Sequence, residues 1–169
     1  MSSSGPEVSF RLVDSPVGGL LLGASPAALQ VLEFTDPQKV TARVAAARGA
    51  GQPHPILDQA EQELAEYFAG RRRKFEIPLA YDGSPFQRRV WAGLLGIGYG
   101  ETSSYIELAR RIGDENSLRA VGQANGQNPI AIVIPCHRVI NANGELGGFG
   151  GGALRKQYLL DLERGDRLL

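Results

Sequence analysis

A turn near the middle of the chain, at residues 80–83, divides the sequence into two parts with different hydrophobic patterns. Before it, short apolar runs alternate with polar residues as in strands, and after it the apolar residues recur at helical spacing. Directly after the turn, Ser84 can cap a helix, and Gln87 stands where it completes a capping box. We therefore expect an α+β chain of two domains, an N-terminal structural domain over residues 1–80 and a mostly helical domain over residues 84–169.

The first part predicts a small α/β unit. Turn residues between its first two apolar runs indicate a hairpin, and a third apolar run follows. An alanine-rich segment and a run with apolar residues at helical spacing indicate two helices, the second with Gly70 as its C-terminal cap. The expected elements are strands at residues 8–13, 20–22 and 31–34 and helices at residues 39–48 and 56–68.

Residues 71–74, Arg-Arg-Arg-Lys, are the sharpest run of positive charge. A solvated loop that leads into a strand at residues 75–79 explains this run better than a phosphate site does. The chain has 18 basic and 18 acidic residues, and its halves, divided after residue 80, carry −1 and +1, so no polyanionic partner is indicated. Any nucleic-acid site must be a local arrangement of arginines that binds modestly and is sensitive to salt.

Two short helical segments of the second part, residues 102–112 and 117–124, are separated by a four-residue break and resemble a helix-turn-helix. The second segment is rich in small residues, although a glycine within a helix costs about 1 kcal/mol against alanine. A helix without bulky side chains can bring its backbone close to another surface. Close approach of a ligand and tight packing against a neighbouring helix both account for this composition.

The chain contains one cysteine, Cys136, so an internal disulfide is excluded. The apolar run at residues 131–134 predicts a buried strand that Pro135 ends, which places the thiol at the mouth of the core. A thiol attacks as the thiolate and needs a base nearby, and His137 follows directly. A buried structural cysteine is the alternative. If the pair is catalytic, a third group should orient the imidazole, and the sequence leaves three candidates open: Glu145, Asp161 and Glu163.

The segment at residues 144–152 holds six glycines around one aromatic residue, Phe149. Such a loop offers bare backbone groups to a flat polar ligand, whereas the alternative is a flexible linker. A helical run directly after it favours an ordered pocket wall. The apolar residues of this run are Leu154, Tyr158, Leu159 and Leu162.

Several of these motifs, taken in order over residues 84–163, resemble one family, the O6-alkylguanine-DNA alkyltransferases. The Pro-Cys-His-Arg-Val signature is specific by itself. The matching motifs are FQRRVW at 86–91, YGET at 99–102, RAVG at 119–122, NP at 128–129, PCHRV at 135–139 and GGFGGG at 147–152. The part before residue 81 is similar to the variable RNase-H-like domain of this family and carries little signature, and the second part resembles its winged helix-turn-helix domain.

The resemblance implies a DNA repair protein that flips out O6-alkylguanine, chiefly O6-methylguanine but also O4-methylthymine, and transfers the alkyl group irreversibly to Cys136. As a methylated-DNA–protein-cysteine S-methyltransferase, each molecule would act once. His137 matches the base that deprotonates the thiol through a water, and Glu163 matches the carboxylate that orients this histidine. Asn128 matches the asparagine that braces the active-site turn.

The resemblance also implies residues that contact DNA and the base. Arg119 matches the finger that replaces the extruded nucleotide in the duplex, Tyr105 matches the tyrosine that helps to rotate the base, and Gln87 falls at a phosphate contact. The implied base pocket comprises Tyr105, Val139, Phe149 and Gly150. Phe149 and Gly150 stand where tyrosine and serine are frequent in the family, so tolerance of bulky alkyl groups is not carried over.

The implied partner is double-stranded DNA that carries alkylated guanine, bound at the minor groove by a monomer that binds cooperatively. The resemblance implies no cofactor. With two histidines and one cysteine, the chain also lacks the ligands of the N-terminal zinc site of some relatives. We expect no membrane segment or secretory signal, and a cytoplasmic location with access to the nucleoid of a prokaryote.

Two other classes of protein compete with this interpretation. A lesion sensor would bind and flip alkylated guanine without chemistry, and Cys136 argues against it. A cysteine hydrolase would turn over repeatedly and need oxyanion-hole donors near the thiol, and a redox sensor would need a second, resolving cysteine.

Overall fold

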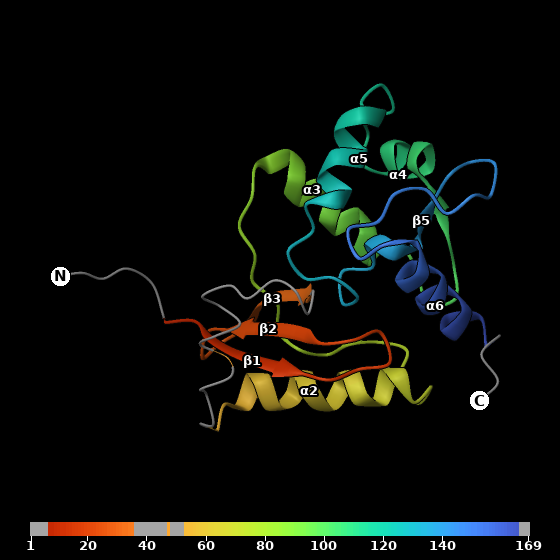
Figure 1. Cartoon of the computed structure of the whole chain (residues 1–169). Helices are drawn as coiled ribbons and strands as arrows, with labels where there is room; N and C mark the ends of the chain where they lie inside the picture. The colour runs from red at the N-terminus through yellow and green to blue at the C-terminus, as the bar shows by residue number, and fades with distance from the viewer. Residues whose placement is uncertain (1–6, 36–46, 48–52, 166–169) are drawn as a thin grey trace. The chain divides into compact units, whose positions relative to one another are not determined.

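The computed structural model describes residues 7–35, 47 and 53–165, and it separates into two units within the predicted turn. One unit comprises Met1–Tyr81 and the other Asp82–Leu169. Strands and one long helix make up the described part of the first unit, whereas short helices dominate the second (Figure 1). The expected α+β class is therefore confirmed.

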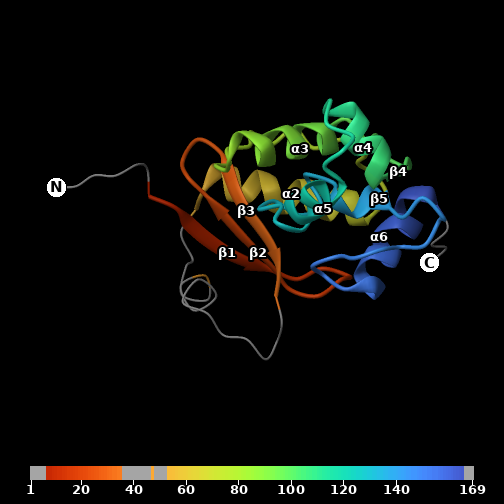
Figure 2. The same cartoon turned by 90° about the horizontal axis from the view of Figure 1, so that it is seen from above.

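The first unit contains an antiparallel sheet of order β1-β2-β3, whose strands lie side by side in Figure 2. The predicted hairpin and third strand are confirmed, and the third strand begins two residues earlier than expected. The strands are β1 (Ser9–Val13), β2 (Leu20–Ala24) and β3 (Leu29–Phe34).

The central strand β2 is buried along its whole length, which explains why its sequence is uniformly apolar rather than alternating. Leu21 packs with Ala47 on one face of the sheet. Leu20 lies on the other face with Leu64 and Phe68. Ala47 is helical, but the rest of the helix expected at residues 39–48 lies outside the described residues.

Helix α2 (Pro55–Phe68) runs along the sheet (Figure 1) and confirms the second predicted helix. Its start is capped by the imidazole of His54, whose Nδ1 accepts a hydrogen bond from the backbone N–H of Leu57 at 3.2 Å. The predicted cap, Gly70, follows the last helical turn with φ of +76°, a conformation that glycine adopts without strain. One of the two histidines of the chain therefore has a structural role in this unit.

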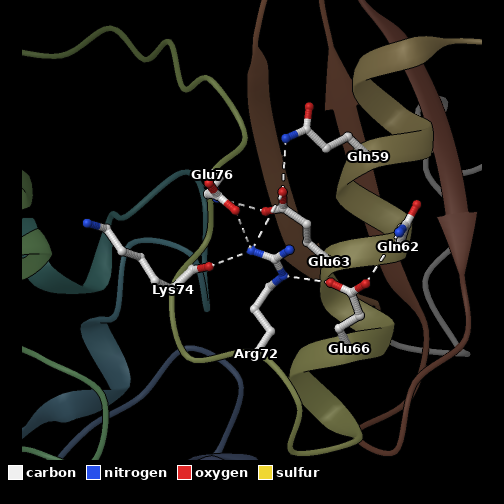
Figure 3. A network of polar contacts seen from close by, with 7 residues as sticks. All are labelled: Gln59, Gln62, Glu63, Glu66, Arg72, Lys74 and Glu76. Carbon is white, nitrogen blue, oxygen red and sulfur yellow. Dashed lines mark hydrogen bonds and ion pairs between the residues drawn. The ribbon is translucent and has the colours of Figure 1, made fainter.

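The basic run at residues 71–74 lies in a loop, as predicted, and Arg72 is held there by carboxylates (Figure 3). Its guanidinium bonds Glu66 at 2.7 Å, Glu76 at 3.1 Å and the carbonyl of Lys74 at 2.8 Å. These partners occupy the side chain that a phosphate would otherwise bind.

The strand expected at residues 75–79 is wrong, because only Leu79 forms a bridge, to Leu29. Pro78 has no N–H to donate to a ladder. The backbone N–H of Glu76 instead donates to the buried carboxylate of Glu63 on α2 at 2.8 Å, so this segment meets the sheet only at its end, where Leu29 bonds Pro78 and Ala80.

The described part of the second unit contains four α-helices, one turn of 3-10 helix and a short parallel pair of strands (Figures 1 and 2). Helix α5 packs against α3 and α4, and the indole N–H of Trp91 donates to the carbonyl of Ala124 at 2.9 Å, which ties α3 to α5. The elements are α3 (Pro85–Leu95), β4 (Ser103–Ser104), α4 (Tyr105–Arg111), α5 (Leu118–Gly126), η1 (Cys136–Arg138), β5 (Val139–Ile140) and α6 (Ala153–Arg164).

The helix starts of this unit follow local capping chemistry. The capping box of Ser84 and Gln87 is confirmed. The helix expected from residue 102 begins instead at Tyr105. Ser104 caps this helix together with Glu107 in a second capping box, and Ser103 and Ser104 pair with β5. Among the described helices, none has the length and apolar character that a bilayer span requires.

Candidate active site

Cys136 lies on a single turn of 3-10 helix, η1, rather than at the end of a strand. The strand predicted at residues 131–134 is wrong. These residues form a turn in which Ile132 has φ of +71° and Ile134 donates to the carbonyl of Ile130 at 2.9 Å. The run is apolar because it is buried, and a short buried run cannot be assigned to a strand by its pattern alone.

The side chain of Asn128 holds this turn at two points. Its amide nitrogen donates to the carbonyl of Ile134 at 2.6 Å, and its amide oxygen accepts from the N–H of Ile130 at 3.0 Å. The same side chain lowers the pKa of the Cys136 thiol, against the effect of burial. One amide thus fixes the turn and favours ionisation of the thiol that follows it.

His137 is fully buried, and its Nε2 lies 2.7 Å from a carboxylate oxygen of Glu163 on α6. The structure therefore selects Glu163 among the three candidate carboxylates, since Glu145 is exposed and Asp161 accepts from Gln157. Within the described part of the chain, the other ring nitrogen, Nδ1, has no hydrogen-bond partner. That nitrogen is therefore free to bind a proton or a water.

Arg138 is the second partner of Glu163, which the sequence does not reveal. Its Nε and one terminal nitrogen bond the two carboxylate oxygens at 2.7 and 3.1 Å, and its other terminal nitrogen donates to the carbonyl of Ile97 at 2.6 Å. Burial alone would raise the pKa of Glu163, but His137 and Arg138 outweigh it and hold this pKa at about 2. Glu163 is therefore ionised at neutral pH.

Burial lowers the pKa of His137, and the opposing hydrogen bond of Glu163 does not restore it. The imidazole is therefore neutral at neutral pH, which is the state that can accept a proton. Burial also raises the pKa of the Cys136 thiol, although Asn128 and the charge of Lys156 oppose this effect. The resting site therefore holds a protonated thiol, 6% exposed, beside a neutral base.

Lys156 is a buried cation that the sequence analysis does not single out. Its ammonium donates to the carbonyls of Val139 at 2.6 Å and Gly148 at 3.2 Å, and also to that of Leu146, so it ties the glycine-rich loop to β5. The helical spacing of α6 indicates that Lys156 is buried, because residues 156, 159, 160 and 163 share the buried face.

The charges of this cluster favour a thiolate once a base removes the proton. Arg138 and Lys156 carry two positive charges against the single negative charge of Glu163. A thiolate at Cys136 would therefore offset the one positive charge left over among these three side chains.

Tyr105 lies beside Cys136, at the start of α4, and is half-buried. A Cβ atom at Gly122 would lie 3.9 Å from its ring, and one at Gly147 would lie 3.5 Å from its hydroxyl. Tyr105 thus stands between α5 and the glycine-rich loop. Burial raises its pKa, and the neighbouring Cys136 adds to this rise.

The other predicted site residues lie in different settings. Arg119 is exposed in the first turn of α5, and Val139 is buried next to η1 with its carbonyl bonded to Lys156. Gln87 is occupied at both ends, since its amide oxygen accepts from Ser84 and its nitrogen donates to Gln127 at 2.8 Å. In the glycine-rich loop, Phe149 is partly buried and Gly150 is exposed.

Acid is expected to destabilise the fold through Glu163 and His137. The pKa of Glu163 is about 2 instead of 4.5, so its contribution is complete above pH 4.5 and is lost as the pH falls toward 2. That difference corresponds to about 3 kcal/mol at neutral pH. The lowered pKa of His137 acts in the same direction below about pH 6.5, where the unfolded chain binds the proton more readily.

Chemical denaturation between pH 7 and pH 3 tests this expectation. The free energy of unfolding should fall more steeply for the wild type than for Glu163→Gln, whereas Glu145→Gln, which removes an exposed carboxylate, should follow the wild type. Equal pH dependence of the wild type and Glu163→Gln would contradict the assignment.

Comparison with known proteins gives two family models that together cover most of the chain. Residues 8–81 match the ribonuclease-like domain of 6-O-methylguanine DNA methyltransferase, and residues 85–165 match its DNA binding domain. A methylated-DNA–protein-cysteine methyltransferase of Mycolicibacterium paratuberculosis is 49% identical over 157 residues, which are 93% of each chain. The protein of the same name from Methanosarcina acetivorans is 40% identical, over 91% of this chain and 97% of the relative.

The solved structures agree with these matches. The crystal structure of the Mycobacterium tuberculosis O6-methylguanine methyltransferase is 42% identical, covers 96% of both chains and superimposes with a TM-score of 0.82. The M. tuberculosis OGT in complex with DNA is 43% identical, covers 94% of both chains and has the same TM-score. The fold expected from the resemblance, a small ribonuclease-like unit followed by a helical DNA-binding unit, is therefore confirmed.

Proposed function

This chain belongs to the 6-O-methylguanine DNA methyltransferase family, and we propose that it repairs DNA by moving the alkyl group from O6 of guanine to the sulfur of Cys136. The observation that carries this proposal is the arrangement of Cys136 on η1 next to a buried His137 that is bonded to Glu163. The thioether formed on Cys136 is not hydrolysed by water at neutral pH, so each molecule acts once.

The proposed reaction is a displacement at a saturated carbon. His137 accepts the thiol proton through a water at its free Nδ1, and Glu163 stabilises the imidazolium that forms. The thiolate attacks the methyl carbon, the bond from that carbon to O6 breaks, and the electron pair goes to guanine. Guanine then takes up one proton, the imidazolium returns its proton to the surrounding water, and the hydroxyl of Tyr105 donates a hydrogen bond to the departing base. Such a displacement needs alignment of sulfur, carbon and oxygen rather than an oxyanion hole.

We assign DNA binding to residues 84–169 and a structural role to residues 1–80. The helix pair α4 and α5 presents the exposed Arg119, and the small residues of α5 suit close approach to the minor groove. Arg119 then fills the space of the extruded nucleotide, since a base inside a duplex must leave the stack before the thiol can reach it. A phosphate contact of Gln87 would require it to leave Gln127.

The base pocket comprises Tyr105, Val139, Phe149 and Gly150, and O4-methylthymine is a second substrate because its methyl group is bonded to an equivalent exocyclic oxygen. The protein is a monomer in solution that binds cooperatively to DNA. It acts in the cytoplasm of a prokaryote, where it reaches the nucleoid.

Intact mass after incubation with a duplex that carries one O6-methylguanine tests the function. The wild type should gain the mass of one methyl group, with a peptide map that places it on Cys136, and the amount of repaired DNA should equal the amount of protein. Repair of many lesions by each molecule would indicate a hydrolytic enzyme instead. Binding without any gain of mass would indicate a lesion sensor.

Arg119→Ala is expected to slow repair in duplex DNA by about 10- to 100-fold, because the gap left by the flipped nucleotide is then unfilled. Its reaction with free O6-methylguanine base should be unchanged, since the side chain is exposed and is not among the groups that shift the pKa of the Cys136 thiol. Single-turnover rates with both substrates make the comparison, and Arg110→Ala, which removes another exposed arginine of the helix pair, is the matched control. Equal losses with both substrates would reject the finger role.

A further inference from the structure

Arg138 lies directly after His137 on η1, and both side chains reach the same carboxylate on α6. Nε of Arg138 donates to Oε1 of Glu163 at 2.7 Å and a terminal nitrogen donates to Oε2 at 3.1 Å, while Nε2 of His137 lies 2.7 Å from Oε2. None of these three side chains is more than 8% exposed. The other terminal nitrogen of Arg138 donates to the carbonyl of Ile97 at 2.6 Å, which anchors the guanidinium on its far side.

The charge of Arg138 works against the imidazolium that forms when His137 takes a proton. Burial lowers the pKa of His137, Glu163 opposes this effect, and the positive charges of Arg138 and Lys156 add to it. Burying a guanidinium also costs free energy. Stabilisation of the imidazolium therefore does not explain why an arginine shares this carboxylate.

The arginine matters for which ring nitrogen of His137 carries the proton. A neutral imidazole has one N–H and one bare nitrogen, and the partner of one nitrogen decides the state of the other. An ionised carboxylate can only accept, so it places the proton on Nε2 and leaves Nδ1 bare. A protonated carboxyl can donate to Nε2, and the ring proton then lies on Nδ1, where it prevents this nitrogen from taking the thiol proton.

Burial favours the protonated carboxyl, and Arg138 opposes it. Burial alone raises the pKa of Glu163, and the hydrogen bonds and charges of His137 and Arg138 hold it at about 2. Of these two partners, only the guanidinium is charged in the resting site. It bonds both oxygens in the two-pronged geometry that arginine offers to carboxylates, which strongly favours the ionised form.

The other ionisable groups around the pair do not replace Arg138 in this role. On η1, the Cys136 thiol is protonated at rest. On α6, the three protons of the Lys156 ammonium are directed at three backbone carbonyls. In the segment after α3, Tyr99 presents its ring to the guanidinium, 5.9 Å from the ring centre, and the exposed Glu101 accepts from a backbone N–H.

We propose that Arg138 is a positioning residue: by holding both oxygens of Glu163 it keeps this carboxylate an acceptor, so that His137 carries its proton on Nε2 and offers Nδ1 to the thiol. This inference rests on the proposed function, because a bare Nδ1 matters only if Cys136 must be deprotonated. Among the described residues Nδ1 has no hydrogen-bond partner, which agrees with this state. Arg138 touches neither guanine nor the sulfur in this scheme, and it acts through Glu163 and the imidazole.

The position of the ring proton is tested in the free protein, without DNA. Nitrogen-15 NMR of the histidine side chains distinguishes protonated from bare ring nitrogens, and His54→Asn assigns the other imidazole. At pH 7 the wild type should show a protonated Nε2 and a bare Nδ1 for His137. In Arg138→Gln the pair should bind one more proton. Nδ1 should then be protonated, whether that proton lies on the imidazole or on Glu163 as a donor to Nε2.

Three further variants serve as controls. Arg164→Gln removes an exposed arginine next to Glu163 in the sequence and should leave the ring proton on Nε2. Arg138→Lys keeps a positive charge at the carboxylate and should do the same. Arg138→Met is a second neutral variant in case glutamine at this buried position does not fold, and it should resemble Arg138→Gln.

Two results would overturn the inference, whatever the activity. One is a bare Nδ1 at pH 7 in a folded neutral variant of Arg138, since the carboxylate would then stay an acceptor without the arginine. The other is a protonated Nδ1 in the wild type or in Arg138→Lys, since the positive charge would then not set the position of the proton.

The consequence for transfer is tested by single-turnover rates at saturating lesion duplex. At pH 7, Arg138→Gln should react about 10- to 100-fold more slowly than the wild type, with an unchanged DNA dissociation constant. The loss should shrink toward pH 9, because the additional proton then leaves and Nδ1 becomes bare. An equal loss at pH 7 and pH 9 would reduce Arg138 to a structural residue.

These outcomes separate the inference from the proposed function. A wild type that gains no methyl group refutes alkyl transfer. If the wild type is methylated but Arg138→Gln keeps the ring proton on Nε2, transfer stands and the role of Arg138 falls.

Discussion

Cys136→Ser is expected to gain no methyl group from lesion-bearing duplex under conditions that alkylate the wild type completely. A serine hydroxyl is a far weaker acid than a thiol, and the neutral His137 next to it cannot hold the proton of an alkoxide. The positive charges of Arg138 and Lys156 therefore favour a thiolate at position 136 but leave a serine hydroxyl protonated. Transfer should fall by at least about 10⁴-fold, measured as intact mass over hours against seconds to minutes for the wild type.

The serine variant should still fold and bind DNA. Oxygen replaces sulfur at a site that is 6% exposed, and the turn before it keeps both of its hydrogen bonds to Asn128. Thermal unfolding and DNA affinity close to those of the wild type are the controls, because α5 and Arg119 are unchanged. A methyl group found on Cys136→Ser at a residue other than position 136 would show that Cys136 is not the acceptor, and a methyl group on the introduced serine at the wild-type rate would show that transfer needs no thiolate.

The parts of the fold that the sequence predicts are those set by neighbouring residues. Ser84 with Gln87 marks a helix start because both partners of the capping box lie within one turn. Gly70 marks a helix end for a similar local reason. The hairpin is predicted because turn residues separate two apolar runs, although the uniform burial of the second strand depends on the helix beneath the sheet.

The turn before Cys136 could not be predicted because its conformation is decided by tertiary contacts. An apolar run of four residues fits a strand, yet these residues form a turn that Asn128 holds from outside the run. Leu154 fails for the opposite reason: the helical pattern includes it among the apolar residues of α6, but it is 89% exposed. The buried face of that helix is set by Lys156 and Glu163, two charged residues that a hydrophobic pattern excludes.

The choice of Glu163 among three carboxylates likewise requires the structure, because 26 residues separate it from His137. Family resemblance names Glu163, but it does not reveal that Arg138 shares the carboxylate. The helical spacing of residues 156 and 163 places Glu163 on the buried face of α6 only when the burial of Lys156 is known. The site is thus a cluster of buried charges, and the sequence pattern does not show how these charges are paired.

His137→Phe is expected to slow transfer by about 10²- to 10⁴-fold, which is the usual contribution of a general base. Phenylalanine fills the same buried space, and Glu163 keeps its two bonds to Arg138 at 2.7 and 3.1 Å, so the carboxylate is not left without a partner. DNA affinity should be unchanged. Single-turnover rates with lesion duplex, measured between pH 6 and pH 9, give the comparison.

The pH dependence of these rates distinguishes loss of a base from loss of structure. In the wild type the imidazole is already neutral at neutral pH because burial lowers its pKa, so the rate should be flat from pH 7 to pH 9. Without it, only the small ionised fraction of a thiol whose pKa burial raises can react, and the rate should climb about tenfold per pH unit. His54→Asn removes the other imidazole while keeping a side chain that caps α2, and its rates should match the wild type. A His137→Phe variant with a flat profile would show that the thiol loses its proton by another route.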